Sequence, residues 1–318
     1  MAAGEVALRL AIPQRRERSP WAMALRQLLR NRLAVVSAIF VTLVIGGAIF
    51  ADLISPYDFA TNHLKDNYAL PGSTYLMGAD ALGRDILSRT IYGARVSIAV
   101  AVVAATVSLV VGITYGLVSG YFGGRIDDIM MRIVDFLYGL PILIVIILMQ
   151  VYFKALSRRG SAVGLVGLII GANKAMGGLL FIFIAMGLLN WIGMARITRG
   201  QVLSYKEKEF IEAAHMVGAN NVRIIFRHLL PNILGPCIVQ ETLSIPAYIL
   251  TEAFLSFIGL GVDPPTPSWG IMLQEGYQAL RSYSHVLVAP SMALTLTVLA
   301  FNFLGDGLRD ALDPRLYE

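Results

Sequence analysis

The sequence predicts an all-α membrane protein with six transmembrane helices, and three observations lead to this prediction. Of the 318 residues, 56% are hydrophobic and 15% are charged, whereas soluble domains average about 25% charged residues. Several apolar stretches reach about 20 residues, which is the helix length that crosses a bilayer. Basic residues cluster beside these stretches, where positive charge reports membrane orientation.

Six apolar stretches are the expected spans. In chain order they occupy residues 33–54, 97–118, 129–153, 174–194, 232–257 and 286–305. A further apolar run at 162–171 is too short to cross a bilayer as a helix, so it is expected to be a re-entrant or interfacial segment. The first apolar run is 22 residues long and begins after 32 residues, which predicts an uncleaved anchor instead of a signal peptide.

The chain is expected to form one membrane domain between two tails. The predicted parts are a cytoplasmic N-terminal tail with a pre-span helix (1–32), the first transmembrane helix (33–54), a periplasmic loop (55–96), a five-helix core (97–306) that contains a cytoplasmic loop (197–231), and a C-terminal tail (307–318). With both termini in the cytoplasm, the inner segments hold 17 Lys and Arg residues and the outer loops hold nine. This bias agrees with the positive-inside rule and predicts a multi-pass protein of the inner (plasma) membrane.

One loop opposes this orientation. It contains Lys154, Arg158, Arg159 and Lys174, all on the side assigned to the exterior.

The stretch 204–231 between two spans is amphipathic and predicts a first short helix. Ser204 and Glu207 have the spacing of a capping box, and Gly218 is expected to end the helix. The residues of its apolar face are Phe210, Ala213, Ala214 and Val217.

A second short helix is predicted to begin at Asn220 or Asn221 and to break at Pro231. Its apolar positions are Val222, Ile225, Phe226 and Leu229. An apolar stripe of this size is unfavourable in water, so the two helices are expected either to pack on the membrane surface or to dock into a groove of a partner.

Two acidic residues lie inside the fifth predicted span. Glu241 is nine residues past Asn232, which is about 14 Å deep, and Glu252 lies near the outer edge. A carboxylate at membrane depth normally faces a cavity or a polar partner. Glu241, Glu252, Gln240 and Pro246 are therefore candidate pathway-lining residues, and a hydrogen bond from Glu241 to a neighbouring span is the alternative.

Two outer segments are candidate contact surfaces. The first contains Asp80, Gly83, Arg84, Asp85 and Arg89; it is expected either to contact a partner or to form an interfacial helix that leads into the second span. The second is the proline-rich run before Trp269, which predicts an ordered loop with one short helix or, alternatively, an outer gate.

The sequence lacks the patterns of an enzyme, a metal site or a nucleic-acid-binding protein. None of its five lysines follows a glycine, so it has no phosphate-binding Gly-Lys loop. Its four histidines include no His-Glu-x-x-His pair, and its single Cys237 cannot form an intrachain disulfide. The net charge of +5 comes without zinc-ligand or RNA-binding patterns. We expect no catalytic residue, metal, cofactor or nucleic-acid partner for this chain.

Four sequence blocks resemble the permeases of binding-protein-dependent ABC importers. One is Glu212-Ala213-Ala214 with Gly218 and the later Leu230-Pro231 pair; the others occupy 78–95, 252–261 and 301–314. The resemblance covers nearly the whole chain and is greatest to the C-type permease of the dipeptide, oligopeptide and nickel importer family. Departures from the common family pattern occur at Tyr75, Ala79 and His228 and in the segment 154–178, which is longer than expected.

The resemblance implies a type I ABC importer permease fold with cytoplasmic coupling helices that dock on ATPases. The implied docking residues are Phe210, Glu212, Ala213, Ala214, Val217, Gly218, Asn220 and Asn221, with His228, Leu230 and Pro231 at the end of the loop. It also implies a homologous B-type permease, two ATP-binding subunits that hold ATP and Mg, an extracytoplasmic substrate-binding protein and a lipid bilayer as partners. The implied cargo is a di- or oligopeptide, with nickel chelates or oligosaccharides as alternatives.

Two other classes of function provide alternatives. An ion-coupled secondary transporter needs titratable groups at membrane depth and usually paired broken helices, and Glu241 alone supports it weakly. An intramembrane enzyme needs a nucleophile, metal or cofactor constellation in its spans, and the sequence shows none.

Overall fold

The computed structural model describes residues 20–158 and 164–312, and within them every regular element is a helix. Five helices are long and apolar enough to cross a membrane, and a bent pair adds a sixth span if it is counted as one. The five are α3 (Arg32–Ile49), α5 (Ile86–Phe122), α9 (Leu179–Lys206), α12 (Leu230–Phe257) and α14 (His285–Leu312). The predicted all-α membrane fold is confirmed.

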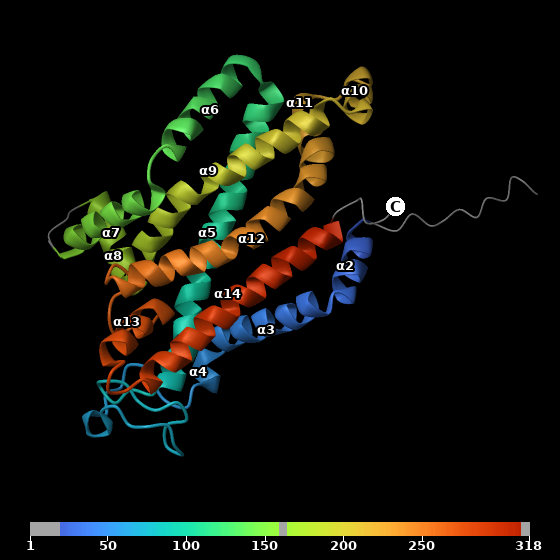
Figure 1. Cartoon of the computed structure of the whole chain (residues 1–318). Coiled ribbons are helices and arrows are strands. Elements are labelled where there is room, and N and C mark those ends of the chain that lie inside the picture. The colour runs from blue at the N-terminus through green and yellow to red at the C-terminus, as the bar shows by residue number, and fades with distance from the viewer. Residues whose placement is uncertain (1–19, 159–163, 313–318) are drawn as a thin grey trace, which may run out of the picture.

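The two ends of the helical bundle carry different elements (Figure 1). α10 (Glu209–Met216) lies at the end towards which α2 (Pro20–Arg30) and the C-terminal end of α14 also point. The segment 55–85 and α13 (Trp269–Ala279) lie at the opposite end. Residues 1–19 and 313–318 of the predicted tails lie outside the described residues.

The first span begins at a side-chain cap. The Asn31 side chain accepts hydrogen bonds from two backbone N–H groups of the first turn of α3, at 3.1 and 3.2 Å, which satisfies donors that have no partner inside the helix. After Phe50 the chain continues into the short α4 (Ala51–Ile54). The predicted span 33–54 therefore corresponds to α3 and α4 together.

The third predicted span, 129–153, is wrong as a single helix. It consists of α6 (Gly124–Tyr138) and α7 (Ile142–Arg158), whose axes are bent by 76°. The break contains Pro141, which has no N–H to donate and disfavours helical geometry at the preceding Leu140. The hydropathy pattern continues through this break, and for that reason it does not reveal the bend.

The fourth span begins later than predicted and extends further. Lys174 belongs to α8 (Leu165–Ala175), an 11-residue apolar helix that overlaps the run 162–171, predicted to be re-entrant or interfacial, and extends four residues beyond it. Gly177 and Gly178 have positive φ angles of 62° and 89°, which only glycine adopts without penalty, and they separate α8 from α9. Residues 162 and 163 of the predicted run lie outside the described residues.

The second span also begins earlier than predicted, so the outer loop ends at residue 85 and not at 96. α5 starts at Ile86 because the Asp85 carboxylate accepts a hydrogen bond from the backbone N–H of Ser88 at 2.7 Å. The remaining segment, 55–85, contains one described 3-10 helix, η1 (Leu64–Asp66).

Three glycines on α5 allow close contact with α9. A Cβ atom added at Gly112 would lie 2.6 Å from the Met194 Cβ, and one at Gly116 would lie 2.5 Å from the Ala195 carbonyl oxygen. Gly120, one turn further on, would meet the Val202 Cβ at 2.9 Å. Small residues spaced four apart let two membrane helices approach closely, which increases van der Waals packing.

A buried ionic cluster joins the segment 55–85 to α5 and α13. Arg84 Nε donates to Asp80 Oδ2 at 2.8 Å, and Arg84 Nη2 reaches Glu275 Oε1 at 3.2 Å. Arg89 Nη1 bonds to the same Asp80 carboxylate and to Glu275 Oε2, the latter at 2.5 Å. Asp80 and Arg89 are each 2% exposed, so these charges pair inside the protein.

The residues predicted to form an outer contact surface are thus not on the surface of this chain. Asp80, Gly83, Arg84, Asp85, Arg89 and Trp269 are all buried. Trp269 lies against α5 and donates from its indole Nε1 to the Thr90 carbonyl at 3.0 Å. Their side chains organise the outer end of the bundle, and contact between this region and a partner stays a prediction.

Replacing Gly116 by valine is expected to separate α5 from α9. The added side chain meets backbone at 2.5 Å, and forced overpacking costs about 1–3 kcal/mol. The thermal midpoint of the detergent-solubilised chain, followed by loss of the monomeric size-exclusion peak, should fall. Gly193→Val is the matched control, because a Cβ there meets nothing within 4 Å. Equal midpoints for the two variants would contradict the close contact.

Arg89→Met is expected to loosen the outer end, because it leaves the buried Asp80 carboxylate with fewer compensating charges. Removing one partner of a buried pair costs about 3–5 kcal/mol. Proteinase K should then cut within 55–85 under native conditions much faster than in the unaltered chain. The control is Arg95→Met, whose pair with Asp52 has side chains 42% and 69% exposed and should contribute only about 0–1 kcal/mol. Similar cleavage rates for both variants would show that the cluster is dispensable.

Candidate coupling surface and buried carboxylates

The loop between α9 and α12 begins later than the capping-box prediction places it. Ser204 lies inside α9, which continues to Lys206, and α10 starts after Lys208 without a side-chain cap. The prediction that Ser204 caps the first loop helix is therefore wrong. The helical hydrogen bonds of a long span extend through this position and leave no free backbone donor for Ser204 to satisfy.

Gly218 ends α10 as predicted, through a specific backbone geometry. Its φ angle is +82°. Its N–H donates to the His215 carbonyl at 2.9 Å, and the next N–H, of Ala219, donates to the Ala214 carbonyl at 3.0 Å. This pair of bonds is a Schellman motif, which satisfies the last carbonyls of the helix. A Cβ at Gly218 would meet nothing within 4 Å, so the requirement for glycine is conformational and not steric.

Asn220 caps the second loop helix, α11 (Asn221–Arg223), by accepting a hydrogen bond from the Arg223 N–H at 2.9 Å. Of the two asparagines predicted as the cap, Asn220 has this role. The other, Asn221, accepts a hydrogen bond from the Tyr121 hydroxyl at 2.9 Å, which ties the loop to the end of α5.

The predicted helix break at Pro231 is wrong. The chain passes from α11 through a π turn, η2 (Ile224–Leu229), directly into α12. The Leu230 N–H bonds to the Ile225 carbonyl, five residues back, and Pro231 follows within the first turn of α12. Proline is tolerated in a first turn, and the π turn provides a local change of winding next to it.

Large apolar side chains occupy two faces of the loop. One face packs on α5, α9 and α12 through residues that are at most 1% exposed: Ile211, Ile224 and Leu229. The other face carries exposed residues: Phe210 (41%), Met216 (88%), Val217 (89%), Val222 (62%) and Phe226 (63%). We call these five residues the exposed apolar patch. The prediction of one apolar face missed Ile211, the most buried residue of α10.

The other predicted docking residues lie in the same loop as this patch or at the start of α12. Glu212, Ala213, Gly218, Asn220, Asn221 and Pro231 are exposed, whereas Ala214, His228 and Leu230 are half-buried. The loop residues predicted to act together therefore do lie together at one end of the bundle.

Polar contacts that the sequence analysis did not identify fix the loop to the spans. Lys206 Nζ donates to the Tyr121 carbonyl at 2.6 Å. Arg199 binds both carboxylate oxygens of Asp127 at 2.6 Å each, which joins α9 to the start of α6. A bidentate pair of this kind has a defined geometry, so the end of α9 that leads into α10 is fixed to α6 and α5.

The two acids of the fifth span both bind serines of α5. Ser108 Oγ donates to Glu241 Oε2 at 2.9 Å, and Ser97 Oγ donates to Glu252 Oε2 at 2.7 Å. The glutamates are 11 residues apart on α12, and the serines are 11 residues apart on α5. Because about 11 residues make three helical turns, equal spacing brings both pairs together between antiparallel helices.

Each carboxylate also has a second partner on its own helix. Tyr248 donates to Glu241 Oε1 at 2.9 Å, and Ser256 donates to Glu252 Oε1 at 2.7 Å. Glu241 is 3% exposed and Glu252 is 0% exposed, while Pro246 is buried and Gln240 half-buried. The contacts in this chain are those of the alternative prediction, a hydrogen bond to a neighbouring span; a pathway-lining role stays a prediction.

Comparison with known proteins places these features in a family. Residues 112–317 match the family described as binding-protein-dependent transport system inner membrane component. Residues 19–71 match the N-terminal transmembrane domain of oligopeptide transport permease C.

Curated relatives match over nearly the full length of the chain. The oligopeptide transport system permease protein OppC of Bacillus subtilis is 42% identical over 94% of this chain and 90% of the relative. The dipeptide permease DppC of the same organism is 42% identical over 92% and 85%, and OppC of Haemophilus influenzae is 39% identical over 98% and 94%. This chain, with its bundle of apolar spans, belongs to the family of binding-protein-dependent transport system inner membrane components, the membrane permeases of ABC importers.

Proposed function

We propose that this chain is the C-type permease subunit of an ATP-driven importer of oligopeptides or dipeptides. The substrate class follows from the relatives, which are named oligopeptide and dipeptide permeases at about 40% identity over most of their length. In this proposal the chain contributes half of a transport pathway and pairs with a homologous B-type permease. An extracytoplasmic binding protein delivers the cargo, and two partner ATPases bind ATP and Mg, so the chain itself needs no cofactor.

The exposed apolar patch is the observation that best supports a role in coupling to the ATPases. Five large apolar side chains, 41–89% exposed, project from one short loop at the end of the bundle. Their exposure to water is unfavourable, and a short helix with an apolar face fits a hydrophobic groove. The Schellman turn and the Asn220 cap hold the two loop helices in fixed positions, so a partner would meet a preformed surface.

The orientation that this role requires has independent support from charge. The coupling end must be cytoplasmic, because ATP is there. α10, α2 and the C-terminal end of α14 point towards the same end of the bundle (Figure 1). The predicted topology assigns 17 of the 26 basic residues to the side of this end, as the positive-inside rule requires. Both termini are therefore assigned to the cytoplasm.

The same geometry suggests how movement of the ATPases reaches the membrane. The stretch Asn221–Phe257 is one continuous helix of 37 residues, or about 55 Å. It starts in the loop between α9 and α12, here called the coupling loop, and contains both Glu241 and Glu252. When the partner ATPases close on ATP, displacement of α10 would move the start of this helix, because Ile211 of α10 lies in one buried cluster with Ile224 and Leu229 of the helix.

Val217→Asp is expected to abolish coupling while the chain still inserts and folds. Val217 is 89% exposed, so a charge there costs little in the isolated chain but would be desolvated in an apolar groove. Co-purification with the ATP-binding subunits and uptake of labelled trialanine should both fall at least tenfold. Leu70→Asp is the matched control, an exposed apolar residue (72%) in the segment at the other end. Normal uptake by Val217→Asp would contradict the docking assignment.

Gly218→Val and Gly218→Asn form a second, conformational test. Valine strains the left-handed backbone at φ +82°, by about 1–2 kcal/mol, whereas asparagine visits this region routinely. Neither side chain meets another atom through its Cβ. Uptake and peptide-stimulated ATP hydrolysis should be lost with valine and largely kept with asparagine. Equal activity of the two variants would show that the turn is not needed for coupling.

An ATP-dependence measurement separates this proposal from an ion-coupled transporter. Vesicles that contain the complete complex should accumulate peptide only with ATP inside. Accumulation by the permease alone, driven by an ion gradient, would support the second class of function.

A further inference from the structure

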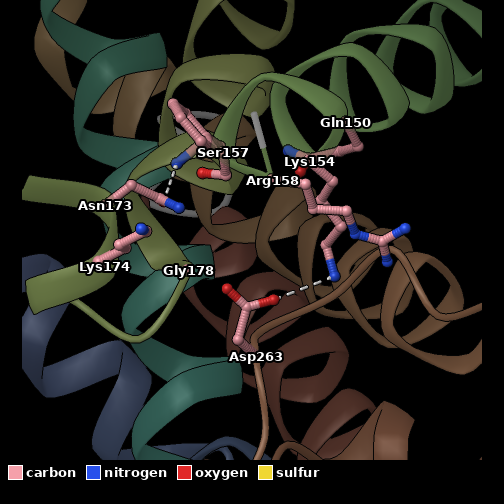
Figure 2. A pocket seen from close by; sticks show the side chains of 9 residues that line it. Gln150, Lys154, Ser157, Arg158, Asn173, Lys174, Gly178 and Asp263 are labelled. Carbon is pink, nitrogen blue, oxygen red and sulfur yellow. Dashed lines mark hydrogen bonds and ion pairs between the residues drawn. The ribbon is translucent and has the colours of Figure 1, made fainter. Parts of the chain in front are cut away.

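A cavity of about 200 Å³ lies between α7, α8, the start of α9 and the loop that follows α12 (Figure 2). It is distant from the coupling loop (Figure 1). Of its α7 and α8 residues, Lys154, Ser157, Arg158, Asn173 and Lys174 lie in the segment 154–178, and Gln150 precedes it. The proposed import mechanism assigns no role to it.

The charges that line the cavity are mostly positive. Lys154 and Arg158 are four residues apart on α7 and therefore share one face of the helix. Lys174, from the last turn of α8, adds a third cation, and Asp263 is the one carboxylate among the described lining residues. Lys154 Nζ lies 3.5 Å from Asp263 Oδ1 and donates to the Gly259 carbonyl at 3.2 Å. A single carboxylate does not balance three cations, so the site favours an anion.

Buried neutral groups in the cavity also lack an acceptor. Gln150 is 1% exposed, yet its amide nitrogen Nε2 has no hydrogen-bond partner, and the hydroxyl of Ser157 has none. Asn173, 2% exposed, lies beside them and accepts a hydrogen bond from the Phe181 N–H at 3.1 Å, so its carbonyl oxygen already has a donor (Figure 2). Buried donors without acceptors cost free energy. The missing component of the site is therefore rich in acceptor oxygens.

The surroundings of the cavity are apolar and exposed. The side chains of Leu148 and Tyr152 on α7 are each 63% exposed, and those of Leu165 and Leu168 on α8 are each 73% exposed. α8 has 11 residues, or about 16 Å, which is too short to cross a bilayer. Apolar surface next to a cluster of Lys and Arg is the arrangement met at a membrane interface, where lipid phosphates lie.

We propose that this cavity binds the phosphate group of an anionic phospholipid, whose acyl chains lie along α7 and α8. Arg158 and Lys174 neutralise the phosphate, and the amide of Gln150 donates to one of its oxygens. The inference depends on the membrane location of the family and not on the peptide cargo, so it stands or fails separately from the proposed transport function.

The test measures binding of phosphatidylglycerol to the delipidated full-length chain by native mass spectrometry. The double variant Arg158→Gln/Lys174→Gln is expected to weaken binding roughly 25-fold, because each cation near a membrane contributes about fivefold. Gln150→Leu, which leaves the net charge unchanged, should weaken it about tenfold. Lys65→Gln/Arg281→Gln is the matched control: it removes two exposed positive charges remote from the cavity and should change binding less than threefold.

A parallel titration with inorganic phosphate distinguishes the two sources of the ligand group. If inorganic phosphate binds as tightly as phosphatidylglycerol and the site variants weaken both equally, the lipid assignment is overturned in favour of free phosphate. If the site variants and the control bind phosphatidylglycerol equally, with equal thermal midpoints, the cavity holds water and the proposal fails.

Discussion

The arrangement of the spans depends on how closely α9 and α12 can approach α5. On one side, Gly112, Gly116 and Gly120 let the α9 backbone come so near that no side chain fits between the helices. Against α12, two buried carboxylates bind two serines of α5. Between helices in lipid the hydrophobic effect provides little attraction, so close packing and interhelical hydrogen bonds determine which helices associate. α5, with 37 residues, is thus the helix against which both α9 and α12 pack.

This arrangement connects the two ends of the molecule. At one end α5 supports the coupling loop through Tyr121, whose carbonyl and hydroxyl oxygens bind Lys206 and Asn221. At the other end its first turns hold the ionic cluster of Asp80, Arg89 and Glu275. A signal from the proposed ATPase contact would therefore travel through rigid helices with buried polar contacts at both ends, and not through flexible loops.

The sequence predicted the features that depend on local composition. It did not predict the contacts between residues that are far apart in the chain. Hydropathy located the apolar spans but not the bend at Pro141 in the third. Turn chemistry identified Gly218 and Asn220, because a positive φ and a helix cap are local requirements. The burial of Arg84 and Arg89 was missed, since their partner Glu275 is 191 and 186 residues away. Ser204 was misassigned because a span extended past its apolar residues. The two serines and the two glutamates have the same 11-residue spacing in the sequence. That spacing predicts their hydrogen bonds only if α5 is already known to pack against α12.

The π turn at Ile224–Leu229 determines the rotational setting of α12. Such a turn accommodates one residue more than an α-helical turn does, and one residue corresponds to about 100° around the helix axis. If these residues wound as ordinary α-helix, everything after them would be rotated by that angle relative to the loop. Glu241 and Glu252 would then point away from Ser108 and Ser97. The direction in which both carboxylates point from α12 is thus fixed by the π turn that precedes the helix.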